Sequence, residues 1–165
     1  MHKMLSHGKV IDNSWTLVAA DVPTTDNLPT GDILVPLALW CEQHSVLKNH
    51  IGAVGVWLDS HEEIETLTGY LDQLPVVAIN FPKFVDGRGF SSARLLRDRY
   101  HYQGEIRAIG SFIRDQLFLM QRCGFSQFSF SDEIDLQAAT ASLSDFSDGY
   151  QSAADQAEPL FKRLR

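Results

Sequence analysis

The sequence predicts an α/β fold built from repeated strand–helix units around a mainly parallel sheet. Apolar runs typical of buried strands recur along the chain, and after residue 50 each is followed by a segment with helical spacing of its apolar residues. Parallel strands joined by crossover helices produce this order. Four such units are compatible with an open doubly wound sheet or with a partial (β/α) barrel, and both closures are kept as expectations.

The composition is that of a globular protein with one sizeable core. The chain has 165 residues, of which 44% are hydrophobic and 21% are charged. We expect a loose N-terminal arm over residues 1–30, with a short strand at 15–20. A single α/β domain is expected over residues 31–151, and a C-terminal helical tail over residues 152–165.

The charge and the cysteines of the chain argue against nucleic acid as a partner and against an oxidising compartment. A net charge of −7 disfavours nucleic acid, because neutralising phosphates requires an excess of Lys and Arg. The sequence has no apolar run long enough to span a bilayer, and its start lacks the apolar core of a signal peptide. Cys41 and Cys123 are isolated cysteines. We therefore expect a cytoplasmic protein with reduced thiols and no membrane partner.

The first half of the expected domain contains two helices and a strand. Residues 36–48 have helical spacing, with Cys41 expected as a small core residue on the inner face. Residues 51–58 are apolar and predict a buried strand. Residues 61–72 are predicted to form an amphipathic helix, because Ile64, Leu67 and Leu71 share one face. Its three glutamates lie in the first turns, where they suit the helix dipole.

The central stretch, residues 76–125, repeats the strand–helix order twice. Its predicted elements are a strand at 76–81, a loop at 82–89, a helix capped by Ser91 or Ser92, a strand at 106–109 and a helix at 112–123 that ends at Gly124. A half-buried strand at 125–130, a weak helix at 132–143 and an amphipathic segment carrying Ala157, Leu160, Phe161 and Leu164 follow.

Positive charge gathers in this central stretch. Residues 83–122 hold eight of the fourteen Lys and Arg but only four acidic residues, a net charge of +4 in a chain of −7. A positive cluster on an acidic protein is a candidate anion site. Arg88 draws attention because two glycines flank it, and Arg107 because it interrupts an apolar strand, where an unpaired charge is costly.

The segment Asp86-Gly87-Arg88-Gly89 resembles part of a phosphate-binding loop, but it lacks the following Gly-Lys-Ser/Thr. A plain tight turn is the first expectation for it, a small oxyanion site the second and a nucleotide site the third. In a parallel sheet, ligands bind at the carboxyl ends of the strands. We expect Asp59, Asn80, the loop at 83–88, the Gly110–Ser111 turn and the Ser131–Asp132 turn on that rim. The candidate ligand-binding residues are Asn80, Lys83, Asp86, Arg88, Arg107 and Asp115. Glu105 and Arg107 share a strand face, so a mutual ion pair is the alternative interpretation for them. No catalytic residue is identified.

The sequence contains no recognisable motif for binding a metal or a redox cofactor. The six histidines lack metal-ligand spacing, and the dinucleotide-binding fingerprint is absent. The sequence therefore indicates no cofactor.

Several short motifs of the central stretch resemble one bacterial family. They are Phe81-Pro82-Lys83-Phe84, Asp86-Gly87-Arg88-Gly89, Arg94-Leu95-Leu96-Arg97, Gly104-Glu105, Arg107-Ala108, Asp115-Gln116, Arg122-Cys123-Gly124-Phe125 and Tyr150-Gln151. The family is the "domain of unknown function 934" group, and the resemblance spans residues 33–151. Its members are encoded beside assimilatory sulfite reductase and are described as oxidoreductases involved in sulfite reduction. The resemblance thus implies a role in that pathway, with sulfite reductase as an expected partner.

Three functions remain open at this point. The first is an accessory protein or oxidoreductase of sulfite reduction that binds a small anion or an acidic partner surface through residues 80–110. The second is a stand-alone barrel-type lyase or oxidoreductase acting on a small anionic or phosphorylated substrate. The third is a non-catalytic scaffold that docks through its C-terminal helix. The open edges of a partial barrel also invite a homodimer.

Overall fold

The structure is a computed structural model, and it describes residues 3–22, 24–25, 28–131, 134–144 and 149–163. Its strands are β1 (Lys3–Ser6), β2 (Lys9–Asp12), β3 (Thr16–Leu17), β4 (Ile33–Pro36), β5 (Val54–Asp59), β6 (Val76–Phe81), β7 (Glu105–Gly110) and β8 (Gln127–Phe130). Its α-helices are α1 (Leu37–Leu47), α2 (Arg88–Asp98), α3 (Leu117–Cys123), α4 (Leu136–Ser142) and α5 (Leu160–Arg163). Its 3-10 helices are η1 (Ile64–Leu67), η2 (Leu71–Gln73) and η3 (Arg114–Gln116).

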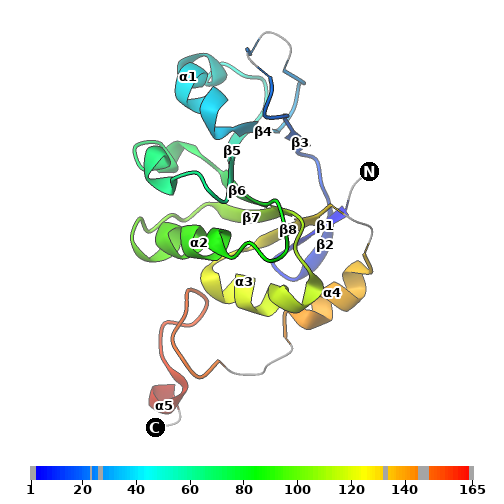
Figure 1. The fold of residues 1–165 in the computed structure, drawn as a ribbon, viewed down its shortest axis with the longest axis vertical. Helices are drawn as coiled ribbons and strands as arrows, with labels where there is room; N and C mark the ends of the chain where they lie inside the picture. The colour runs from blue at the N-terminus through cyan, green and yellow to red at the C-terminus, as the bar shows by residue number, and fades with distance from the viewer. Residues whose placement is uncertain (1–2, 23, 26–27, 132–133, 145–148, 164–165) are drawn as a thin grey trace.

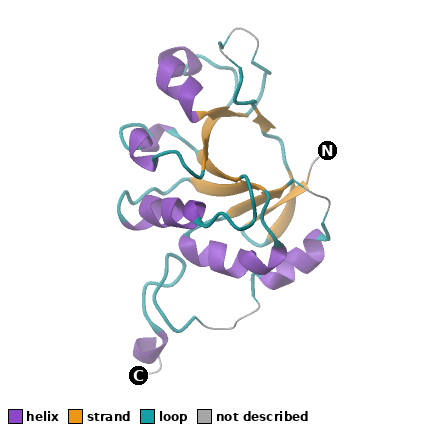
Figure 2. Ribbon diagram, in the orientation of Figure 1, coloured by secondary structure: helices purple, strands orange, loops and turns teal. Residues whose placement is uncertain are grey.

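All eight strands belong to one sheet, in the order β2-β1-β8-β7-β6-β5-β4-β3. From β3 to β8, neighbours in space are neighbours in sequence and run parallel, while the β1–β2 hairpin adds to β8 antiparallel. The sheet curls into a half-barrel with α1, α2 and α3 on its convex side (Figures 1 and 2). The predicted α/β class and mainly parallel sheet are confirmed, and the partial barrel describes the closure better than an open sheet.

The main core lies between the convex face and the helices. Side chains alternate between the two faces of a strand, so Val56, Leu58, Ile79 and Ala108 all point to this side, and each is fully buried. Burying a side chain of the size of Leu or Ile contributes about 1.5–3 kcal/mol. This apolar layer is what holds the helices on the sheet.

A second, smaller apolar cluster lies on the concave face. It contains Leu34, Trp57, Val76, Ala78 and Ile109, with Trp15 packed against it. These positions alternate with those of the main core along each strand. The parallel strands are thus apolar on both faces, which is why they were recognisable in the sequence.

Several predicted elements form as expected. The predicted helix at 36–48 is α1, and the strands at 76–81 and 106–109 are β6 and β7. Gly124 closes α3 with φ 111°, a left-handed conformation that glycine adopts at low cost. The second predicted helix of the central stretch is divided, because η3 and α3 together occupy the range expected for one helix.

Three local predictions are wrong. Residues 61–72 form two 3-10 turns instead of an amphipathic helix, since the chain turns at residues 68–70 between η1 and η2. Helix α2 begins at Arg88 after Gly87, so neither Ser91 nor Ser92 caps it. Cys41 is exposed and is not part of the core.

The expectation of a loose N-terminal arm is also wrong for residues 3–12, while the short strand expected at 15–20 forms as β3. Met4 is 1% exposed and Leu5 is fully buried in β1, which pairs with both β2 and β8. The strands β2 and β3 form the two opposite edges of the sheet. Only residues 13–15 separate them in sequence. This segment, called the strap below, connects the two edges on the side away from α1 and α2 (Figure 1).

The C-terminal segment is held to α3 through Arg122. Its guanidinium lies 3.5 Å from a carboxylate oxygen of Asp155, and the Ala154 amide donates to the Arg122 carbonyl at 3.0 Å. The predicted helix of the tail is limited to α5, where Phe161 is 54% exposed, and Leu164 lies outside the described residues. Within the described ranges, every helix is too short or too polar to cross a bilayer.

Candidate ligand cavity on the concave face

A cavity of about 390 Å³ opens on the concave face of the half-barrel. Its polar wall consists of Asn13, Asn80, Arg107, Ser129 and Ser131. Its apolar wall consists of Trp15, Leu17, Leu34, Ile109 and Phe130. The volume lies in the range of small-molecule sites in proteins, about 300–1,000 Å³. A cavity with one charged group, several neutral polar groups and an apolar wall is suited to a small ligand.

The register of the strands explains which side chains reach this cavity. Arg107 of β7 stands between Ala78 of β6 and Gln127 of β8 in one row across the sheet. The next row toward the carboxyl ends contains Asp59 and Asn80, followed by Ile109 and Ser129. Because side chains alternate between faces, both rows point to the concave side. The strap adds Asn13 and Trp15 from the opposite direction.

Arg107 is the central charged group of the cavity and is only 1% exposed. Its Nε donates to Oε1 of Gln127 at 2.8 Å, and its Nη1 donates to Oδ1 of Asn13 at 3.5 Å. Its Cζ lies 5.3 Å from the ring centroid of Trp15. Burial lowers the pKa of Arg107 to about 10, against an opposing contribution from Glu105, so the side chain is a cation at neutral pH.

This buried cation has no close carboxylate in the described part of the chain. No Asp or Glu oxygen described there lies within 4.0 Å of the Arg107 nitrogens. A buried charge is costly unless it is paired, so such an arginine is typical of a site that receives an anion.

Glu105 faces the same side of β7 but binds other partners. Its carboxylate accepts from Ser126 Oγ, and its two oxygens lie 3.0 Å from Nε2 of His7. The alternative that Glu105 and Arg107 pair with each other is therefore wrong. Burial raises the pKa of Glu105, but the hydrogen bonds from Ser126 and His7 and the charge of Arg97 outweigh it, so the pKa lies below its ordinary value.

Asn80 is fixed at the carboxyl end of β6 by two neighbours. Its Nδ2 donates to Oδ1 of Asp59, at the end of β5. Gly110, at the end of β7, has φ 91°, and a Cβ on it would lie 2.4 Å from Oδ1 of Asn80. Glycine is therefore required at residue 110 both for the backbone conformation and for the space that Asn80 occupies.

In the loop Asp86–Gly89, which resembles part of a phosphate-binding loop, the carboxylate of Asp86 pairs with Arg88. Asp86 accepts from Nε of Arg88 at 2.9 Å and from Nη2 at 2.6 Å, and it also accepts from the Arg88 amide and from Ser60 Oγ. The bonds from Arg88 and then from Ser60 hold the pKa of Asp86 well below its usual range. The carboxylate of Asp86 thus occupies the position at the start of α2 where an external anion would bind. Gly89 serves packing, since a Cβ there would lie 2.8 Å from the Phe81 ring.

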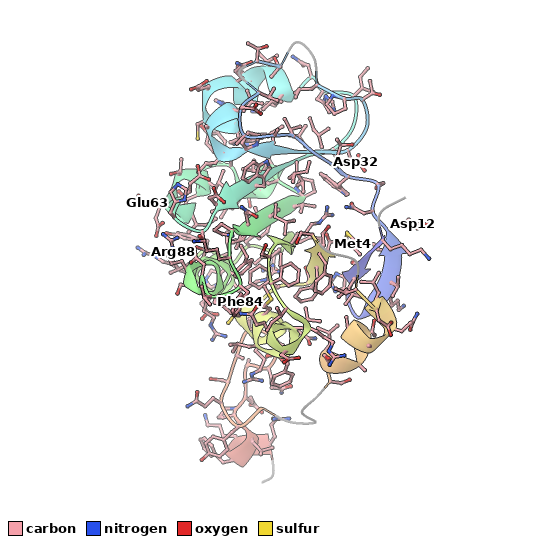
Figure 3. The ribbon with its side chains drawn as sticks, turned by 45° about the vertical axis from the view of Figure 1, so that its right-hand side comes forward. Met4, Asp12, Asp32, Glu63, Phe84 and Arg88 are labelled. Carbon is pink, nitrogen blue, oxygen red and sulfur yellow. The ribbon has the colours of Figure 1, made fainter. Side chains whose placement is uncertain are left out.

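The six predicted site residues therefore do not form one site. Asn80 and Arg107 line the concave cavity, whereas Asp86 and Arg88 pair beside α2. Figure 3 shows Arg88 on the helical side of the sheet, well apart from Asp12 and Met4 across it. Lys83 is exposed, and Asp115 is exposed with a carboxylate oxygen 3.9 Å from Nε of Arg114. The predicted Ser131–Asp132 turn lies partly outside the described residues.

Cys123 is the less exposed of the two free cysteines described. It is partly buried between charged neighbours, and burial raises its pKa. A raised pKa leaves little thiolate at neutral pH, so the structure gives no reason to treat Cys123 as a nucleophile.

Sequence comparison assigns the chain to a family. Residues 55–161 match the family described as "Bacterial protein of unknown function (DUF934)", and this range is more than half of the chain. The chain belongs to the DUF934 family. The resemblance seen in the sequence motifs is confirmed, while its link to sulfite reduction remains a prediction. No curated protein matches the chain.

The family match includes only part of the cavity lining. Asn80, Arg107, Ile109 and Ser129 lie inside the matched range, and the strap lies before it. Sequence reasoning missed Asn13, Trp15 and Ser129, whereas Ser131 was expected on the rim. A tryptophan in an otherwise polar N-terminal segment was the available signal for the strap.

Proposed function

We propose that this DUF934 protein binds a small anion in the concave cavity, with Arg107 as the main cationic contact. The observation that carries the proposal is the almost fully buried Arg107 guanidinium, which lines a cavity and has no described carboxylate within 4.0 Å. A bound anion would offset the cost of burying this charge and would receive charge-assisted hydrogen bonds.

The surroundings of Arg107 favour one fixed orientation of its guanidinium. Gln127 holds Nε, Asn13 holds Nη1, and the ring of Trp15 lies against the planar group. Side chains held by their neighbours lose little entropy when a ligand binds. Asn80, Ser129 and Ser131 bring further hydrogen-bonding groups to the same wall.

We infer a cytoplasmic role in assimilatory sulfite reduction, as an accessory protein or oxidoreductase that works with sulfite reductase. This part of the proposal rests on the family resemblance and on the anion-binding character of the cavity. A growth test addresses it directly. Cells that carry Arg107→Gln in place of the native protein should grow slowly on sulfite and normally on cysteine.

A second candidate function is a stand-alone enzyme acting on a small anionic substrate. Asp59 and Asn80 are hydrogen-bonded at the carboxyl ends of adjacent strands, which is where (β/α) barrels carry their catalytic groups. A carboxylate one row above a buried arginine could transfer a proton while the arginine holds the substrate. If this is the activity, Asp59→Asn abolishes turnover but leaves Arg107-dependent binding in place.

Thermal unfolding in the presence of single anions tests the binding proposal. The panel contains sulfite, sulfate, phosphate, acetate and methanesulfonate at constant ionic strength. An anion present at 100 times its Kd should raise Tm by roughly 5–10 °C. Arg107→Gln should lose this shift. Arg94→Gln is the matched control, because Arg94 is an arginine of α2 that pairs with Asp98 outside the cavity. A shift that persists in Arg107→Gln, or no shift with any anion, contradicts the proposal.

A further inference from the structure

We infer that the ligand of this cavity is an organic monoanion with a short apolar chain, a sulfonate or a carboxylate. This inference rests on the proposed function and specifies its ligand class. Beside its polar groups the cavity has an apolar lining, which combines side chains from the concave faces of β3, β4 and β7. Those side chains are Leu17, Leu34 and Ile109.

An inorganic anion has no apolar group that could contact the apolar lining of the cavity. Leu17 is 53% exposed, and it lies on the concave face beside Leu34 and Ile109, which are 2% and 7% exposed. A compact oxyanion bound at Arg107 would leave this apolar surface in contact with water. A hydrocarbon chain attached to the same head group would cover it, and burial of apolar surface is favourable.

The charges around the cavity favour a single negative charge on the ligand. Arg107 is the one cation among the residues described as lining it. Asp59 lies in the row above, bonded to Asn80, and Glu105 lies in the row below, bonded to Ser126 and His7. These two carboxylates repel a second negative charge, so a dianion such as sulfate or phosphate is disfavoured relative to a monoanion.

A chain-length series measured by isothermal titration calorimetry tests the inference. The ligands are methane-, propane- and hexanesulfonate, together with the matching carboxylates acetate, butyrate and heptanoate, at constant ionic strength. Each methylene that becomes buried should tighten binding about three- to fourfold, until the chain fills the cavity. The two series show whether the head group is read as a sulfonate or as a carboxylate.

Two leucine variants distinguish binding of the ligand chain to the cavity lining from nonspecific binding to exposed apolar side chains. Leu17→Ser should reduce the ratio of hexanesulfonate to methanesulfonate affinity. Leu119→Ser should leave that ratio unchanged, because Leu119 is similarly exposed, at 55%, but belongs to α3 and does not line the cavity. Circular dichroism confirms that both variants are folded before they are compared.

The outcomes distinguish this inference from the proposed function. If methanesulfonate, acetate or sulfite binds in an Arg107-dependent way but longer chains bind no more tightly, the inference is overturned and the anion-binding function stands. If no anion of any kind binds, both are overturned. If the chain-length gain is the same in Leu17→Ser as in the native protein, the apolar wall is not where the chain lies.

Discussion

Trp15 lies against the guanidinium of Arg107, with Cζ of the arginine 5.3 Å from the centroid of the tryptophan ring. One residue belongs to the strap that joins the two edges of the half-barrel, and the other stands in the middle of the sheet on β7. The N-terminal segment is therefore part of the candidate site, although the family match begins only at residue 55.

Replacing Trp15 should weaken both the fold and the cavity. The Arg107–Trp15 contact is a cation–π interaction between a buried arginine and a partly buried tryptophan. Such contacts contribute about 0.5–2 kcal/mol. Trp15→Ala should lower the free energy of unfolding in urea by at least this amount, because apolar packing is lost as well. Trp15→Phe, which keeps an aromatic ring, should lose less. Equal stability of Trp15→Ala and the native protein would show that the strap does not hold Arg107.

The pairing of Glu105 should make stability depend on acid pH. Its folded-state pKa lies below the ordinary value of 4.5, with Ser126, His7 and Arg97 as the groups that favour the charged form. A lowered folded pKa stabilises the fold above the unfolded pKa, and this contribution disappears as pH falls through the folded value.

The test compares native protein and Glu105→Gln by urea unfolding from pH 7 to pH 3. The native protein should be the more stable of the two at pH 6–7, and the difference should narrow below about pH 4.5. Asp115→Asn serves as the control, since Asp115 is a solvent-exposed carboxylate. A difference that stays constant across this range would mean that Glu105 titrates alike in the folded and unfolded chain.

Gly110 is expected to tolerate no side chain. Its φ of 91° is unfavourable for alanine, and the added Cβ would lie 2.4 Å from Oδ1 of Asn80. Gly110→Ala should therefore cost about 1–3 kcal/mol of stability and should weaken ligand binding, because Asn80 must move. Gly69→Ala is a suitable control, since nothing lies within 4 Å of the position of its Cβ. Urea unfolding and calorimetry measure the two effects separately.

The parts of the fold that were predictable are those with local signals. The strands β5, β6 and β7 are buried on both faces and therefore appear as apolar runs. Gly124 marks a helix end by its own conformational preference. The strand β1 gives no such signal, because its four residues are stabilised by pairing with β8 at the other end of the chain.

The residues of the candidate site likewise include some that local sequence signals predict and others that they do not. Arg107 could be selected from sequence because a charge within an apolar strand is unusual. Arg88 was selected for the glycines beside it, but the acid two residues earlier neutralises it, a local pairing that the motif did not reveal. The contacts of Asn13 and Trp15 with Arg107 depend on the closure of the sheet, so no local pattern predicts them.

The Asp86–Arg88 pair and the concave cavity are expected to act independently. Asp86 accepts hydrogen bonds from the Arg88 side chain and amide at the start of α2, and Ser60 adds another from the loop after β5. Asp86→Ala should therefore lower Tm, because the start of α2 loses its acceptor. The affinity for the anion that binds best to the native protein should stay the same.

Arg88→Gln provides the companion measurement, because it removes the cation and retains a polar side chain of similar length. It should likewise leave the calorimetric Kd unchanged, in contrast to Arg107→Gln. If either Asp86→Ala or Arg88→Gln weakens anion binding as strongly as Arg107→Gln does, the loop and the cavity form one site. In that case the glycine-flanked arginine contributes to the ligand after all, and the rim of the sheet must close toward Arg107 when the anion binds.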